Sequence, residues 1–401
     1  MSSRWRSPGT DRIPRGVWTL GFVSLFMDVS SEMIHALLPV FLVTALGAST
    51  LAVGLIEGTA EAVASVTKVF SGVWSDQMRR RKPLAVAGYA LAAATKPVFA
   101  LADTVGWVFA ARFFDRVGKG VRGAPRDALV ADLAPPRLRG RSFGLRQALD
   151  TVGAFSGPLI AIGLMALTGD AFRVVFWVAL VPALLAVALL TLGVREPASQ
   201  AASDRPAPRL ADVRRLGRPF WAVVAVAAVL TLARFSEAFL VLRAEEVGIP
   251  LTFVPIVMVV MNVAYALSAY PAGAIADHVG GRDTVLLLGI GLLVVADLIL
   301  ALGGTALLTL LGVAVWGLHM GFSQGLFATL VADAAPVELR GSAFGAFNLV
   351  IGVALLAASA AAGVLWGFYG SKTVFLAGAV VSCVALVGYS AVSVDPSRRR
   401  Q

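Results

Sequence analysis

The sequence predicts an all-α membrane protein with 12 transmembrane helices in two pseudo-symmetric six-helix bundles. Three observations predict this fold: the composition, a series of long apolar runs, and an internal repeat. Of the 401 residues, 58% are hydrophobic and only 14% are charged, whereas a soluble domain carries about 25% charged residues. The formal net charge of +10 comes from basic residues in loops beside apolar runs. That pattern is typical of membrane topology and excludes a nucleic-acid partner.

Each predicted span is an apolar run long enough to cross the bilayer, which takes about 20 residues as a helix. No short apolar core with a cleavage site follows the N-terminal arginines, so the first run is expected to be a retained span. The predicted spans are residues 17–46, 51–74, 83–102, 106–133, 140–167, 173–194, 219–244, 251–275, 284–302, 305–332, 341–368 and 373–393.

Basic residues alternate between the loops and predict the orientation. They cluster at 79–82, 137–141, 205–218 and 398–400, whereas the opposite loops hold little beyond Arg173, Arg243 and Lys372. Basic loops stay in the cytoplasm. Both termini are therefore expected to be cytoplasmic, in the plasma (inner) membrane of a bacterium.

A charged, proline-containing linker at 195–218 divides the spans six and six, into bundles at 1–194 and 219–401. The two halves also resemble each other. The segment Leu-Val-Ala-Asp-x-Ala-Pro at 129–135 returns 201 residues later at 330–336, and Leu-Arg-Gly follows both copies. Two Gly-x-x-x-Asp segments, at 72–76 and 273–277, have the same offset. Two matches at one offset indicate a duplicated unit with a pseudo-two-fold axis along the membrane normal.

These motifs resemble the major facilitator superfamily over almost the whole chain. Gly72-x-x-x-Asp76 followed by basic residues is similar to its signature loop between helices two and three, although Arg79 replaces a glycine. The resemblance implies an inner gate, in which an acidic residue at a cytoplasmic helix end pairs with a helix N-terminus or an arginine. The candidate gating residues are Asp76, Arg80, Arg81, Arg139, Asp277, Arg282 and Arg340.

Two further motifs resemble those of the superfamily's antiporters. In the fourth span, Arg112-x-x-Asp115 stands where these antiporters have Arg-x-x-Gln, and the family associates this arginine with proton transfer. The fifth span carries a glycine–proline motif, whose small residues allow close helix approach and whose proline bends the span. Generic helix packing is the alternative interpretation. The motif residues are Gly144, Gly153, Gly157 and Pro158.

Charged residues inside the first five spans are the candidates for transport chemistry. Asp28, Glu32 and His35 lie at i, i+4 and i+7, on one helix face. A charge at bilayer depth costs about 2.5–3.5 kcal/mol, so such groups line a water-filled path or find a partner. Arg126 and Asp127 are instead expected at the cytoplasmic end of their helix. The other candidates are Glu57, Glu61, Arg112, Asp115, Lys119, Arg122, Arg146 and Asp150.

Two roles are open for these charges: ion pairs that hold helices together, or a hydrated site that exchanges protons and substrate. We expect the second, in a secondary active transporter that exports a solute against protons, with Asp28 or Glu32 carrying the proton. The alternatives are a uniporter or symporter that imports an organic solute or an anion, and a receptor without transport.

The expected substrate is a small organic molecule or a divalent metal ion. Asp28, Glu32 and His35 offer oxygen and nitrogen ligands for a transition metal, and residues 28–33 are similar to bacterial superfamily members linked to nickel resistance. No nucleotide loop, paired-histidine motif or serine elbow is present, so neither an enzyme nor a cofactor is expected. The single cysteine, Cys383, excludes an intrachain disulfide. The expected partners are the solute, protons and lipid, and a monomer is expected.

Overall fold

The computed structural model describes residues 12–77, 81–135, 138–196, 215–278, 282–336 and 339–393. These residues form helices, and no strand occurs among them. Ten helices within these ranges are long and apolar enough to cross a membrane. The all-helical fold predicted from the long apolar runs is therefore confirmed.

The first half begins with a long segment that is kinked after His35. Its three parts are α1 (Arg15–His35), α2 (Leu38–Val40) and the π-helical η1 (Phe41–Ala45). Four long helices follow, and a segment in three pieces ends this half. These elements are α3 (Thr50–Gln77), α4 (Lys82–Leu101), α5 (Val105–Leu133), α6 (Arg139–Thr168), α7 (Phe172–Val178), α8 (Leu180–Ala188) and the π-helical η3 (Leu189–Gly193).

The second half begins with an interrupted segment. Its polar stretch, residues 234–237, separates α9 (Arg218–Ala233) from α10 (Ala238–Glu246). The backbone N–H of Ser236, released from the helix, donates instead to Ser359 Oγ. The span predicted at 219–244 is thus two helices. The remaining elements are η5 (Leu251–Phe253), α11 (Ile256–His278), α12 (Arg282–Leu302), α13 (Ala306–Ala334), α14 (Arg340–Tyr369) and α15 (Ser371–Ser393).

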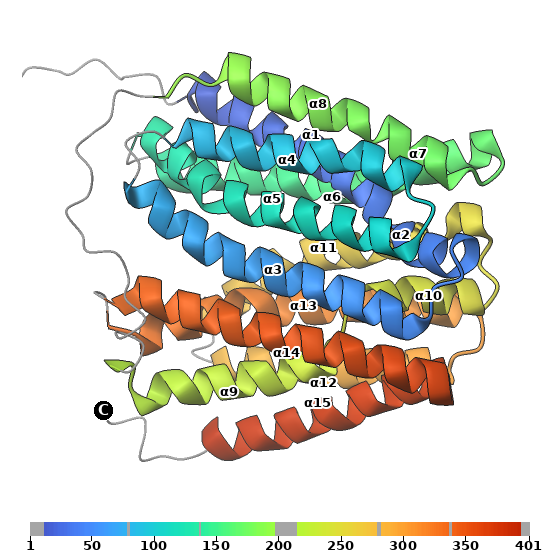
Figure 1. Ribbon diagram of the computed structural model, residues 1–401. Helices are drawn as coiled ribbons and strands as arrows, with labels where there is room; N and C mark the ends of the chain where they lie inside the picture. Colours follow the sequence, from blue (N-terminus) through green and yellow to red (C-terminus); the bar gives the residue numbers. More distant parts are fainter. Residues whose placement is uncertain are drawn as a thin grey trace, which may run out of the picture.

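Helices of each half pack mainly against one another, and Figure 1 shows the first half (blue to green) above the second (yellow-green to red). The halves meet where α3 packs along α14 and where α6 packs against α11. Glycines allow the first contact: a Cβ on Gly58 would lie 2.8 Å from the Cα of Leu356. Small residues at such positions let helix backbones approach closely.

Close packing of α6 on α1 positions the acidic residues of α1. A Cβ on Gly153 would lie 2.7 Å from a backbone carbonyl oxygen of α1 and would crowd the Cβ of Asp28. A Cβ on Gly157 would also lie 2.7 Å from a backbone carbonyl oxygen of α1 and would crowd the Cβ of Glu32. Pro158, also from the motif, lies inside α6. A Cβ on Gly144 would meet no heavy atom within 4 Å, so this glycine is not part of the contact.

Gly157→Val should therefore destabilise the protein, because the added side chain forces α1 and α6 apart. Overpacking of this kind costs about 1–3 kcal/mol. Gly163→Val is the matched control, since Gly163 lies on the same helix with nothing within 4 Å of an added Cβ. Thermal melting of the purified variants in detergent measures the difference. Equal melting temperatures for the two variants would contradict the close contact.

Candidate functional site

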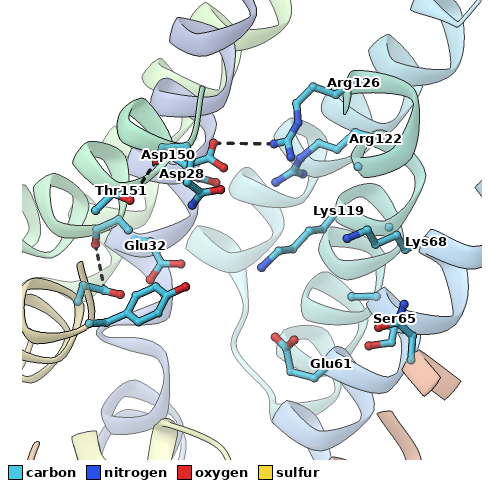
Figure 2. A pocket seen from close by; sticks show the side chains of 18 residues that line it. Asp28, Glu32, Glu61, Ser65, Lys68, Lys119, Arg122, Arg126, Asp150 and Thr151 are labelled. Atoms are coloured by element: carbon cyan, nitrogen blue, oxygen red, sulfur yellow. Dashed lines mark hydrogen bonds and ion pairs between the residues drawn. The ribbon is translucent and has the colours of Figure 1, made fainter. Parts of the chain in front are cut away.

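A cavity of about 420 Å³ lies between α1, α3, α5 and α6 of the first half and α11 and α14 of the second. Ligand pockets typically measure about 300–1,000 Å³, so this cavity fits a small solute. Eight charged side chains line it (Figure 2). The acids are Asp28, Glu32, Glu61 and Asp150, and the bases are Lys68, Lys119, Arg122 and Arg126.

The sequence-predicted site residues divide into a group that lines the cavity and a group buried around it. The lining group is Asp28, Glu32, Glu61, Lys119, Arg122 and Asp150. The buried group is His35, Glu57, Arg112, Asp115 and Arg146. Helical spacing alone predicted both groups as one site, because it does not separate the face toward the cavity from the face toward a neighbouring helix.

A buried network connects the cavity to the interior of the first half. Arg112 Nη2 donates to Glu57 Oε2 at 2.6 Å, and these side chains are only 2% and 1% exposed. His35 lies between the two carboxylates, with Nε2 3.6 Å from Glu57 Oε2 and Nδ1 3.3 Å from Glu32 Oε2. Since Glu32 lines the cavity, His35 links the cavity surface to the buried Glu57–Arg112 pair.

Lys96 and Arg116, which were not among the predicted site residues, form two further ion pairs in the first half. Lys96 Nζ donates to Asp115 Oδ1 at 2.9 Å, and both side chains are buried. Arg116 Nη1 lies 3.3 Å from Glu61 Oε1, at the edge of the cavity. The available signal was that each is a base inside a predicted span, which needs an acid or water nearby.

Arg126 was predicted at the cytoplasmic helix end, but it lines the cavity and reaches across to α6. Its Nη1 lies 3.9 Å from Asp150 Oδ1 and donates to Ser24 Oγ at 3.2 Å. Asp150 also pairs with Arg146, one turn earlier on α6. Figure 2 shows the Arg126–Asp150 contact bridging the two sides of the cavity at one end. Because one α-helical turn spans only about 5.4 Å, a residue near a helix end still reaches the cavity.

The predicted gating residues are only partly within the described residues. Arg81 Nη1 pairs with Asp132 Oδ2 at 3.0 Å, and the Arg81 backbone N–H donates to the Glu196 carboxylate. Arg139 is exposed. Arg80 lies outside the described residues, as do the side chains of Asp76, Asp277, Arg282 and Arg340. The gating role therefore stays a prediction.

The two halves also meet near the loop that follows α6, far from Arg81. Thr252 Oγ1, in η5, donates to Asp170 Oδ1 at 2.5 Å. Nearby, α2 packs against α10 and α6 packs against η5. The cavity residues of α3 and α5 lie toward the other ends of those helices. The cavity is therefore closed by contacts between the halves at the Asp170 end.

The candidate metal ligands do not come together as a set. Asp28 and Glu32 line the cavity, whereas His35 contacts Glu32 and Glu57. Within the described part of the chain, no three His, Cys, Asp or Glu side chains form a group that could hold a metal ion. The second half contributes only uncharged polar groups to the cavity, namely Asn262, Tyr265 and Asn348.

Comparison with known proteins relates this architecture to a family of transporters. Residues 20–242 and 238–401 match the Major Facilitator Superfamily. An uncharacterised MFS-type transporter of Methanocaldococcus jannaschii is 30% identical over 381 residues, covering 93% of this chain and 94% of the relative. The inner membrane transport protein YajR of Escherichia coli is 26% identical over 403 residues, covering 95% and 84%. A multidrug resistance protein of Yersinia pestis is 31% identical over 150 residues, which is 37% of each chain.

Solved structures show the same fold at low sequence identity. The nucleoside transporter NupG superposes with a TM-score of 0.81 at 14% identity, covering 94% of this chain and 99% of NupG. A bacterial homologue of the human lysosomal transporter Spinster, in an inward-facing and occupied conformation, gives a TM-score of 0.80 at 14% identity, covering 96% and 97%.

The buried Glu57–Arg112 pair should be strongly coupled energetically. Removing one partner leaves an uncompensated buried charge and costs about 3–5 kcal/mol, whereas replacing both with apolar residues is often neutral. We therefore expect Arg112→Met and Glu57→Leu each to lower the melting temperature in detergent more than the double variant does. The exposed Arg81–Asp132 pair is the control, since such pairs contribute about 0–1 kcal/mol. Additive effects of the two single substitutions would contradict the coupling.

Proposed function

The chain belongs to the major facilitator superfamily, and we propose that it is a proton-coupled secondary active transporter that exports a small solute by alternating access. The observation that carries this proposal is the cavity of about 420 Å³ between the two halves, lined by eight charged side chains. Charged groups in membrane spans are expensive and mark substrate and proton pathways. Superfamily proteins bind substrate near the midplane, between two repeats that rock against each other.

The proposal takes all the long helical segments as spans, in two six-helix bundles at 1–194 and 219–401 joined by the linker at 195–218. Helices α3 and α5 are not among the ten apolar ones, but most of their described charges line the cavity or form ion pairs inside the first half. With both termini in the cytoplasm of a bacterial cell, the Asp170 end would face outward. The contacts at that end then support an inward-facing conformation of a monomer in the inner membrane.

Proton coupling is proposed for Asp28 and Glu32. Among the described residues, Asp28 has no ion-pair or hydrogen-bond partner, although it lines the cavity. Glu32 contacts His35, which leads to the Glu57–Arg112 pair. A carboxylate that is open to cavity water in one state and beside a base in another can take up and release a proton as the halves move. Glu32 and the network behind it are arranged for such a change.

Small organic molecules are the preferred substrates over nickel, because the described residues hold no three-ligand metal group. The partial similarity to a multidrug resistance protein and the glycine–proline motif of α6 support export. The geometry of the cavity does not by itself favour export over import. An importing symporter for an organic solute or anion is the second candidate, favoured by Lys119 and Arg122 in the cavity wall.

Transport in inverted membrane vesicles tests this proposal. An acridine dye reports the pH gradient while organic cations, organic anions, ω-amino acids or nickel chloride are added. We expect at least one class to dissipate the gradient in vesicles with the wild-type protein and not in vesicles without it. Asp28→Asn and Glu32→Gln should remove this response, because the carboxylates that would carry the proton are lost.

Asp103→Asn is the matched control, since Asp103 is exposed and lies outside the cavity. It should behave like the wild type in this assay. Normal proton-coupled transport by the Asp28 and Glu32 variants would rule out their assignment. Counterflow without any response of the dye would instead indicate a uniporter.

A further inference from the structure

The charges of the cavity are separated by sign onto opposite walls. Figure 2 shows Asp28 and Glu32 of α1 and Asp150 of α6 on one side. Lys119, Arg122 and Arg126 of α5 and Lys68 of α3 lie on the other. Glu61 is the one acid on the basic side, and it is 3.3 Å from Arg116. The four acids and four bases of the lining cancel in formal charge, but they form an acidic wall and a basic wall.

Some of these charges are already compensated within the protein. Asp150 pairs with Arg146 and lies 3.9 Å from Arg126, and one oxygen of Glu32 contacts His35. These contacts leave Asp28 as the uncompensated acid on the acidic wall.

On the basic wall, neither Lys68 nor Lys119 has an ion-pair partner among the described residues, and both side chains are exposed to the cavity. The guanidinium of Arg122 lies 4.9 Å from the centre of the Tyr89 ring. Its Nη1 is buried and has no hydrogen-bond acceptor in the described part of the chain. Each wall therefore presents charged groups that have no ion-pair partner among the described residues.

We propose that the cavity binds a zwitterionic small solute, with its ammonium group toward Asp28 and Glu32 and its carboxylate or phosphate toward Lys119 and Arg122. This inference rests on the proposed transport function and names its substrate class. A solute that carries both charges satisfies both walls at once. A solute with one charge leaves the opposite wall unpaired, and that unpaired charge becomes costly when the halves close around the solute and exclude water.

The remaining lining groups and the size of the cavity fit this class of solute. Asn262 and Tyr265 of α11 and Thr151 of α6 supply hydrogen-bonding groups without charge. A volume of about 420 Å³ accommodates a small molecule. An ammonium group and a proton also exclude each other at Asp28. Binding of the solute would release that proton into the cavity water, which is the exchange that an antiporter needs.

Binding to the purified full-length protein in detergent tests the inference with matched compounds. The panel is the straight-chain ω-amino acids from three to eight carbons, phosphoethanolamine, and for each amino acid its N-acetyl derivative and its methyl amide. The N-acetyl form keeps only the negative charge, and the amide keeps only the positive one. For at least one chain length, we expect the zwitterion to bind about tenfold or more tightly than both derivatives, because each derivative leaves the charges of one wall without a counter-charge.

Two sets of variants assign the walls. Asp28→Asn should abolish the preference for the zwitterion over its N-acetyl form, and Lys119→Gln combined with Arg122→Gln should abolish the preference over its amide. Asp103→Asn and Lys372→Gln are matched controls at exposed positions outside the cavity. If a variant fails to fold, the affinities of the wild-type protein for the zwitterion and for its two derivatives still test the inference.

Several results would overturn the inference. One is equal or tighter binding of a singly charged derivative at every chain length, and another is no binding of any zwitterion in the panel. Proton-driven transport of a singly charged solute would overturn the zwitterion assignment and leave the transporter proposal standing. Phosphoethanolamine binding without amino-acid binding would support the inference and assign a phosphate to the basic wall.

Discussion

A charged side chain in the hydrocarbon layer is stable only beside water or an opposite charge, and the first half of this protein is arranged around that constraint. Helices α3 and α5 carry many of these charges, and α1, α4 and α6 carry others. Those facing the interior are paired, as Arg112 is with Glu57 and Lys96 is with Asp115. Most of those that remain line the cavity. Ion pairing and exposure to the cavity are therefore two ways to lower the free-energy cost of a charge in the hydrocarbon layer.

The packing of the helices makes this arrangement possible. Gly153 and Gly157 bring α6 against α1, so the acids of both helices lie on the same wall. Contact of α3 with α14 and of α6 with α11 adds the second half, which closes the cavity with uncharged polar groups. The two halves therefore differ: the first half holds the charges of the cavity, and the second half covers them with uncharged polar groups.

Much of this architecture could be predicted from the sequence because apolar length and helical spacing are local properties. The spans, the shared face of Asp28 and Glu32, and the pairing of Arg146 with Asp150 have such local signals. Partners from distant helices have none. Spacing therefore did not indicate that His35 would contact Glu57, or that Arg126 would reach Asp150. The break at residues 234–237 also depends on a distant partner, Ser359, which accepts the released backbone N–H of Ser236.

Cysteine labelling tests most directly whether the charged cavity is a water-filled path between the halves. Ser65→Cys or Thr151→Cys, in a Cys383→Ser background, would be exposed to a membrane-impermeant thiol reagent in inverted and in right-side-out vesicles. We expect labelling from the cytoplasmic side at rest and from the outer side under an opposing proton gradient. Ser382→Cys, buried in α15, should stay unlabelled in both preparations. If the cavity positions were also unreactive from both sides under every gradient, the cavity would be a closed structural core and the account would be wrong.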